Sequence, residues 1–297
     1  MNLRIGLTTG ILLLQLCAPS VAQDRPKYGE REVAELVELA RAESEPEGRR
    51  ARAIRELSQT AVRSHMGVLR RLMREERSLD IRLSAAITLA MLDDRQAPVD
   101  LLLVSAYDRA KTPNCSRGAV LVALGRTRNE AAVLHLERAL REEPPTDEPS
   151  YSADLCRALG YLNTAASRKL LLETLSSGRS EFRKASVQPL SQAVPTIPVA
   201  ERGPIIQAIR DAARLDENAD VASTAMSALL WNGVDGEGFF RLLGSDPSDA
   251  VRLRAARTLA RHPLTPQRQS RVRALAARER NPEILAILNK VLDQTGL

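Results

Sequence analysis

The amino-acid sequence predicts an all-α protein, an α-solenoid of about eight stacked antiparallel helix pairs. Three observations lead to this prediction. No segment shows the sustained alternation of apolar and polar residues that is typical of strands. Apolar residues recur instead at intervals of three and four, in segments of about 12 to 16 residues that polar or proline-containing breaks separate. These segments also repeat along the chain with a period of roughly 33 residues, which indicates a repeat architecture.

One helical pattern sets this period: an apolar residue, a small or apolar residue four positions later, and a leucine after four more. Four segments overlay on the pattern without gaps, namely 79–90, 219–230, 249–260 and 282–293. We call its last residue the reference leucine; it recurs as Leu57, Leu89, Leu124, Leu159, Leu190, Leu229, Leu259 and Leu292. A second helical pattern lies between successive copies, for example at 133–142. The chain is therefore expected to alternate a first helix, A, with a second helix, B, and stacking of the pairs buries faces that one pair alone cannot cover.

Prolines mark two helix starts and one irregular stretch of this pattern. Asp246-Pro247 and Asn281-Pro282 each place an N-cap type of residue before a proline, which suits the first turn of a B helix. Pro189 falls inside the fifth B helix, and Ala193–Pro204 is rich in proline. Because proline removes one helical hydrogen bond, we expect a bend at Pro189 and an irregular connection near residues 189–204.

Residues 1–22 have the three-part layout of a secretory signal peptide. After a positively charged start, an apolar run over residues 5–16 is too short to span a membrane, which takes about 20 apolar residues. Small residues then precede an expected cleavage point after Ala22. We therefore expect residues 23–297 to form a single repeat array that is exported to the periplasm or secreted. Lipidation of Cys17 is the alternative, although a bulky leucine precedes it where a small residue is wanted.

The repeat register also predicts the state of the two remaining cysteines. Cys115 lies nine residues before Leu124, and Cys156 lies three before Leu159. On neighbouring parallel B helices this is an offset of six residues, about 9 Å along the axis. Helix axes lie roughly 8 to 10 Å apart, which puts the two Cα atoms beyond the ~7 Å that a disulfide can span. We expect two free, mostly buried thiols.

The repeats carry a resemblance to a known family. Asp249–Ala260, with its Val-Arg and Ala-Ala pairs and its final leucine, resembles the second helix of HEAT repeats. Residues 116–126 and 155–162 resemble the leucine-glycine version in bacterial HEAT-like repeats of the phycobilisome-lyase type. The resemblance covers about residues 29 to 294. It implies that the free side of the B helices lines a concave surface. Relatives of that type attach chromophores to cysteines, but an exported protein would not meet that substrate, and we do not expect lyase activity.

The sequence offers little support for catalysis. It contains no HExxH, no GxSxG, no phosphate-cradling glycine loop and no cysteine-pair motif. His65, His135 and His262 fall in different repeats and lack metal-ligand spacing. We therefore expect no enzymatic activity, no cofactor and no metal. With a formal net charge of +6 and 3% aromatic residues, an exported protein is expected to meet acidic proteins or envelope phosphates rather than nucleic acid.

Binding is the function that the periodicity favours. Positions two and five before the reference leucine, and two after it, lie about 140° to 160° from that leucine around the helix, so the resemblance implies that they face a ligand. The partner-binding residues that we predict are Arg157, Tyr161, Trp231, Arg254, Arg257 and Arg261. Because residues 251–280 carry nine arginines against one acid, we predict an acidic protein partner, with Trp231 and Tyr161 as apolar anchors. The alternative is a binder of anionic envelope polymers that uses generic positive charge.

Overall fold

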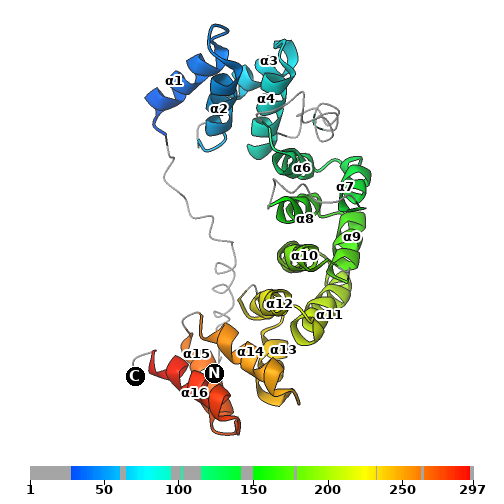
Figure 1. Ribbon diagram of the computed structural model, residues 1–297, viewed down its shortest axis with the longest axis vertical. Helices are drawn as coiled ribbons and strands as arrows, with labels where there is room; N and C mark the ends of the chain where they lie inside the picture. Colours follow the sequence, from blue (N-terminus) through cyan, green and yellow to red (C-terminus); the bar gives the residue numbers. More distant parts are fainter. Residues whose placement is uncertain are drawn as a thin grey trace, which may run out of the picture.

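The computed structural model describes residues 28–60, 65–94, 102, 115–141, 150–176, 179–231, 233–261 and 264–294. In these residues it contains fifteen α-helices, one short 3₁₀ helix and no strand. The α-helices form the predicted α-solenoid of stacked antiparallel pairs (Figure 1). The A helix expected for the third pair and the signal peptide expected at residues 1–22 fall outside the described residues.

The helices occupy two layers of a curved array. The B helices are α2 (Glu47–Leu57), α4 (Leu79–Met91), α6 (Arg117–Arg126), α8 (Tyr151–Leu162), α10 (Ser180–Ala193), α12 (Ala219–Trp231), α14 (Asp249–Leu259) and α16 (Pro282–Asp293). The A helices are α1 (Glu30–Arg41), α3 (Met66–Glu75), α7 (Ala132–Arg141), α9 (Ala165–Leu175), α11 (Val199–Leu215), α13 (Gly236–Ser245) and α15 (Pro266–Ala276). Figure 1 shows α6, α8, α10 and α12 along the inner side of the curve, and α7, α9 and α11 along its outer side.

The reference leucines mark the core of the array. Each lies in a B helix, and all of them except Leu292 have a relative exposure of 0%. Leu292, on the last described B helix, is half-buried. Consecutive B helices pack against one another, and one hydrophobic core extends from Val33 to Val291. The predicted period and register are thus confirmed.

Two glycines allow the central B helices to approach closely. A Cβ atom added to Gly125 on α6 would lie 2.3 Å from the carbonyl oxygen of Ala158 on α8. One added to Gly160 on α8 would lie 2.7 Å from the Cβ atom of Pro189 on α10. The leucine-glycine pairs of α6 and α8 therefore have a packing role, since any larger residue would push the neighbouring helix away.

The irregular connection expected near residues 189–204 is confined to residues 194–198. The helix α10 continues through Pro189 to Ala193, a 3₁₀ turn (η2) follows at Val194–Thr196, and α11 already starts at Val199. Since α10 has 14 residues and α11 has 17, longer helices rather than a long loop account for the wide repeat spacing here. Pro189 is tolerated inside the helix because its ring packs against the bare backbone of Gly160.

One of the two predicted N-caps is confirmed and one is wrong. Asn281 caps α16 with Pro282 in the first turn, and its side chain accepts hydrogen bonds from two backbone N–H groups of that turn. Asp246 instead follows α13, and Ser248 is the residue before α14. The Asp246 carboxylate accepts hydrogen bonds from the Arg214 guanidinium at 2.8 Å and from the Ser248 backbone N–H at 2.9 Å. The Asp246 carboxylate, which the local sequence predicted as an N-cap, is thus bound by Arg214 of α11 instead.

The two cysteines are free and buried, as predicted. The Cys115 Sγ atom lies 3.4 Å from Ser84 Oγ on α4, and the Cys156 Sγ atom lies 3.9 Å from the carbonyl oxygen of Phe182 on α10. Burial raises the pKa of the Cys115 thiol to about 11 and that of the Cys156 thiol to about 12. Both thiols are therefore protonated at neutral pH.

We expect these thiols to resist modification in the folded protein. Because only the thiolate is nucleophilic, raising a thiol pKa by two units lowers its reactive fraction about 100-fold, before any barrier to access is counted. A thiol-exchange reagent at pH 8 should label the chain starting at Gln23 at least about 100-fold more slowly when folded than in denaturant. Rapid labelling of either cysteine in the folded state, or a mass that shows them linked, would contradict the packing described above.

Candidate binding surface

The inner face of the array carries a hollow of about 430 Å³ across three consecutive B helices, α8, α10 and α12. Its lining residues are Ser152, Ala153, Arg157, Gly160, Tyr161, Glu181, Lys184, Ala185, Gln188, Pro189, Gln192 and Thr224. We call this hollow the concave groove. The predicted residues Arg157 and Tyr161 both line it, two positions to either side of Leu159. The periodicity therefore identified the face of α8 that borders the groove.

The basic groups of the groove are only partly neutralised. The exposed Arg157 guanidinium donates a hydrogen bond to the Asp154 carboxylate at 2.9 Å. Lys184 lies 3.1 Å from the Asp220 carboxylate on α12, and both of these side chains are half or more exposed. A guanidinium has five N–H donors, so Arg157 retains donors for a further acceptor. The groove can therefore accept a carboxylate-bearing ligand at these positions.

Tyr161 is held at the rim of the groove by a neighbouring helix. The Arg126 guanidinium of α6 lies 4.5 Å from the Tyr161 ring centroid and donates a hydrogen bond to its hydroxyl oxygen at 3.2 Å. The same guanidinium reaches the carbonyl oxygen of Met91 at 3.1 Å. The aromatic ring is thus positioned by contacts that connect three consecutive B helices.

The middle of the groove is polar and belongs to α10. Gln188 and Gln192 lie one helical turn apart and are both exposed. The prediction did not include Lys184 and Glu181, although they lie four and seven residues before Gln188 on the same helix face. Extending the periodicity by one turn toward the start of each B helix would have found them.

The predicted arginine stripe lies on α14 and the residues that follow it, opposite Val251, Ala255 and Leu259, which are all buried as expected. Its three members nonetheless contact other repeats, and each has a different partner. Arg257 pairs with Glu283 of α16 at 2.7 Å, Arg261 donates to Ser223 Oγ of α12 at 3.2 Å, and Arg254 donates to the Ala213 carbonyl oxygen of α11 at 3.4 Å. The stripe therefore connects repeats as well as facing solvent. Trp231 ends α12, and its side chain lies outside the described residues.

Other arginines form cross-repeat ion pairs that the sequence interpretation missed. In each, an arginine seven residues before a reference leucine reaches a carboxylate beyond the next A helix, and the pairs are Arg50–Glu76, Arg183–Asp216 and Arg252–Glu279. Burial alone would raise the pKa of each carboxyl, but hydrogen bonds from the arginine and from backbone N–H groups outweigh it and hold the pKa below its usual range. Much of the arginine content therefore stabilises the array. The recurrence of arginine at this register was the available clue.

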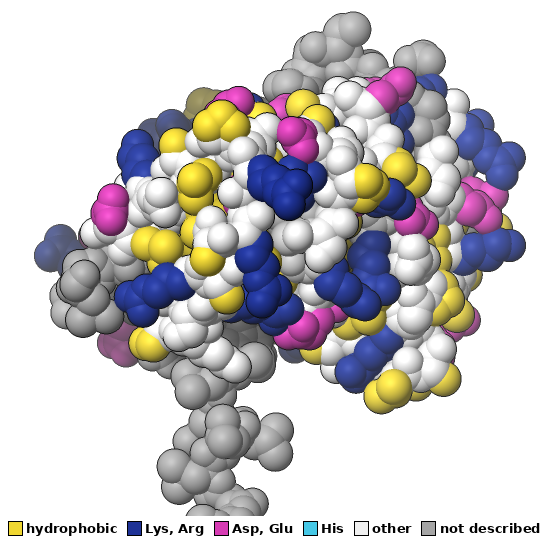
Figure 2. All heavy atoms as spheres, turned by 90° about the horizontal axis from the view of Figure 1, so that it is seen from below, with side chains coloured by type: hydrophobic (Ala, Val, Ile, Leu, Met, Phe, Trp, Pro, Cys, Tyr) yellow, Lys and Arg dark blue, Asp and Glu magenta, His cyan; other side chains and the backbone are white. Residues whose placement is uncertain are grey.

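The C-terminal end of the array carries basic side chains that lack such partners. Figure 2 views the molecule from this end, and Lys and Arg side chains recur across the whole face. Arg273, Arg278 and Arg280 are exposed, and within the described part of the chain their guanidinium groups make no ion pair. This end is therefore a second basic surface, separate from the concave groove.

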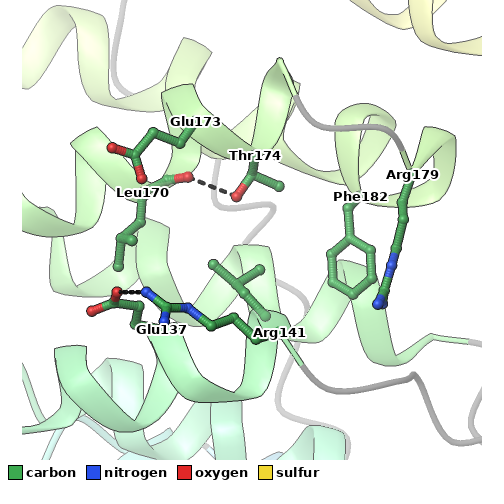
Figure 3. Close-up of a pocket in the computed structure, with 8 residues that line it drawn as sticks. Glu137, Arg141, Leu170, Glu173, Thr174, Arg179 and Phe182 are labelled. Atoms are coloured by element: carbon green, nitrogen blue, oxygen red, sulfur yellow. Dashed lines mark hydrogen bonds and ion pairs between the residues drawn. The ribbon is translucent and has the colours of Figure 1, made fainter.

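A smaller hollow of about 310 Å³ lies on the outer side, between α7, α9 and the start of α10. Figure 3 shows its charged groups engaged with near neighbours: Arg141 donates to Glu137 of the same helix at 2.5 Å. Arg179 lies over the ring of Phe182, 5.5 Å from its centroid. None of the residues that line this pocket was a predicted binding residue.

The described residues contain neither a candidate metal cluster nor a candidate membrane span. No group of three or more His, Cys, Asp and Glu side chains there could hold a metal ion, and no helix there has the length and apolar character needed to cross a bilayer. Among the histidines, His65 is buried and His135 half-buried, while His262 lies outside the described residues. Burial lowers the pKa of His65.

Comparisons with known proteins do not indicate what this surface binds. No protein-family model matches the chain, and no curated protein matches it. Among solved structures, it is similar to the crystal structure of an engineered protein from the Northeast Structural Genomics Consortium, with 18% identity and a TM-score of 0.43. The similarity covers 89% of this chain and 78% of the engineered one. A likeness at this level carries no information on function.

Proposed function

We propose that the chain is an exported, non-catalytic scaffold of HEAT-like repeats that binds an acidic protein partner on its concave surface. The observation that carries this proposal is the concave groove, a hollow of about 430 Å³ lined by three stacked B helices. Because packed helices hold the backbone of the groove in place, a partner can be bound without ordering a loop.

The chemistry of the groove supports a partner with exposed carboxylates. Arg157 of α8 and Lys184 of α10 line the groove together with the Gln188 and Gln192 amides of α10, which offer both donors and acceptors. Tyr161 adds a positioned aromatic surface of the kind that is enriched at protein interfaces. This arrangement combines charge attraction with contacts that depend on shape.

The export part of the proposal depends on the sequence of residues 1–22 alone. Cleavage after Ala22 would leave a chain beginning at Gln23, and this removes none of the residues that the structure describes. Lipidation of Cys17 would instead leave a chain beginning at that residue. The mass of the protein isolated from its own cell envelope distinguishes these two forms.

The test is affinity capture from an envelope extract at low and moderate salt, with the chain from Gln23 as bait. We expect wild type to retain one acidic protein at both salts and an Arg157→Glu, Tyr161→Ala variant to lose it. An Arg254→Glu, Arg257→Glu, Arg261→Glu variant tests whether the stripe adds to the same surface. A matched control, Lys169→Glu with Leu134→Ala, makes one charge reversal and one truncation at exposed outer positions. Equal capture by all four baits would place binding elsewhere.

The alternative, binding of anionic envelope polymers, is favoured by the exposed Arg273, Arg278 and Arg280 at the C-terminal end. Attraction between exposed charges fades beyond about 10 Å at 0.1 M salt. Polymer binding should therefore disappear at moderate salt and should be insensitive to Tyr161, whereas a packed protein interface should weaken less.

A further inference from the structure

The two ends of the array carry opposite charge. Residues 30–47, which form α1 and the turn into α2, contain seven glutamates and two arginines. Residues 251–280, which include α14 and α15, contain nine arginines and one glutamate. Figure 1 places these segments at opposite ends of the solenoid. Over the complete terminal pairs the excess is smaller: residues 30–57 contain eight glutamates and six arginines, and residues 266–293 contain five arginines and one lysine against two glutamates and one aspartate. The two terminal pairs are therefore opposite in net charge, which favours contact with a second copy placed end to end.

At the N-terminal end, part of the acidic charge is already neutralised. Arg31, Arg41 and Arg49 form ion pairs within one helical turn, and their acceptors are Glu35, Glu38 and Glu45. Glu30, Glu43 and Glu47 are exposed and make no ion pair within the described residues. We call these three glutamates the acidic end.

At the C-terminal end, some basic side chains are paired with glutamates of neighbouring helices or turns and others are not. Arg252, Arg257 and Arg271 each pair with a glutamate of a neighbouring helix or turn. Four exposed basic residues make no ion pair within the described residues: Arg273, Arg278, Arg280 and Lys290. We call these four residues the basic end. Glu32 of α1 and Asp293 of α16 are also exposed and make no ion pair within the described residues. With these two included, the charges left over at the two ends remain opposite in sign.

The contacts between internal repeats show how these ends could meet. Arg257 of α14 reaches Glu283 near the start of the next B helix at 2.7 Å, and Lys184 of α10 reaches Asp220 near the start of α12 at 3.1 Å. Lys290 on α16 occupies the register of Arg257, two residues before the reference leucine, and α16 is the last B helix of the described residues. The acid at the start of the first described B helix is Glu47, which lies ten residues before its reference leucine, whereas Glu283 and Asp220 each lie nine residues before theirs. A second copy stacked as the next repeat would supply the missing partner for each.

The apolar surface at the two ends is consistent with such stacking. Leu292 is half-buried, whereas the other reference leucines, each followed by another B helix, are fully buried. On α1, Leu36, Val37 and Leu39 are likewise half-buried. These areas are modest, so the contact should depend on both concentration and salt.

We propose that the chain associates head to tail with a second copy of itself, the α1–α2 pair of one copy stacking on the α15–α16 pair of another. The contact brings the acidic end of one molecule to the basic end of the next and extends the internal pattern of cross-repeat pairs. It is a heterologous contact, since different surfaces meet, so it leads to rings or open chains rather than closed dimers.

Sedimentation velocity of the chain from Gln23 tests this proposal. Two charge-reversal variants are compared with wild type: Glu30→Lys, Glu43→Lys, Glu47→Lys at the acidic end, and Arg278→Glu, Arg280→Glu, Lys290→Glu at the basic end. We expect wild type to form dimers and larger species at low salt and to return to monomer as salt rises. Each variant alone presents like charges at both of its ends, so each should stay monomeric.

An equimolar mixture of the two variants gives the sharpest result. The unaltered basic end of the first variant meets the unaltered acidic end of the second, and the two reversed ends also attract, so the mixture should associate again. A control that reverses Arg128, Arg141 and Lys169 to glutamate in the middle of the array should associate like wild type after correction for net charge. Should a reversal impair folding, as judged by circular dichroism, neutral glutamine variants at the same positions should show the same loss of association.

Wild type that remains monomeric at low salt up to about 100 μM, within the range of weak contacts, would overturn the proposal. So would a mixture of folded variants that fails to associate, or a control that loses association as fully as the end variants.

Discussion

Replacing Asp216 with asparagine is expected to lower the free energy of unfolding by about 3 kcal/mol at pH 7, because it breaks a buried ion pair and leaves the other charge in place. The Arg183 and Asp216 side chains are 9% and 7% exposed. Arg183 donates two hydrogen bonds to the carboxylate, Nε at 2.8 Å and Nη2 at 2.9 Å. Asparagine can accept only part of this pattern and carries no charge, so the guanidinium would stay buried without its main counter-charge.

The effect of Asp216→Asn should depend on pH in a defined direction. Burial alone would raise the Asp216 pKa, but hydrogen bonds from Arg183 and from the Asn218 backbone N–H outweigh it and hold the pKa below its ordinary value of 3.8. A carboxyl whose pKa is lowered by folding stabilises the folded state above the unfolded-state pKa and loses this contribution as pH falls through the folded-state pKa. The difference between wild type and variant should therefore be constant above about pH 5 and shrink below about pH 4.

Urea denaturation followed by circular dichroism at several pH values measures this difference. A matched control is Asp211→Asn, about one turn earlier at an exposed position of α11, which should change stability by no more than about 0.5 kcal/mol. If Asp216→Asn resembles this control at pH 7, or if its deficit persists unchanged at acid pH, the pair does not stabilise the array in the way described.

The helix pairs were predictable because their pattern is local. A leucine that must be buried once per repeat recurs at a nearly constant interval, and the eight reference leucines locate all eight B helices. Asn281 was also predictable, since a cap involves only its own first turn. Asp246 and Pro189 were not, because Arg214 and Gly160, which decide their roles, lie on other helices of the array.

The candidate surface was likewise predictable only in part. Arg157 and Tyr161 were found because helical periodicity fixes which face a residue is on. Periodicity does not fix which acceptor a long side chain reaches, and Arg257 and Arg261 find theirs on other helices, at Glu283 and Ser223. The sequence thus located the face of each B helix but could not separate arginines that connect repeats from arginines left for a partner.

The close contact between α6 and α8 gives the other large expected effect. Gly125→Ala should lower the free energy of unfolding by about 3 kcal/mol, at the upper end of the range for overpacked cores. The added methyl group would lie 2.3 Å from the Ala158 carbonyl oxygen and 2.5 Å from its Cα atom. Both are backbone atoms of a packed helix, so no side chain can rotate away and α8 itself must move. Alanine's better helix propensity, about 1 kcal/mol relative to glycine, offsets only part of this loss.

The matched control is Gly67→Ala on α3, where the added Cβ atom would meet nothing within 4 Å and no proline follows. There only the propensity term acts, and stability should rise by up to about 1 kcal/mol. Opposite signs for the same substitution in two helices, measured by urea denaturation, would assign the effect to the α6–α8 contact. Because α8 also carries Arg157 and Tyr161, Gly125→Ala should further weaken capture of the partner by more than its loss of folded protein explains. If Gly125→Ala is as stable as wild type, the B helices do not pack as closely as the leucine-glycine pairs require.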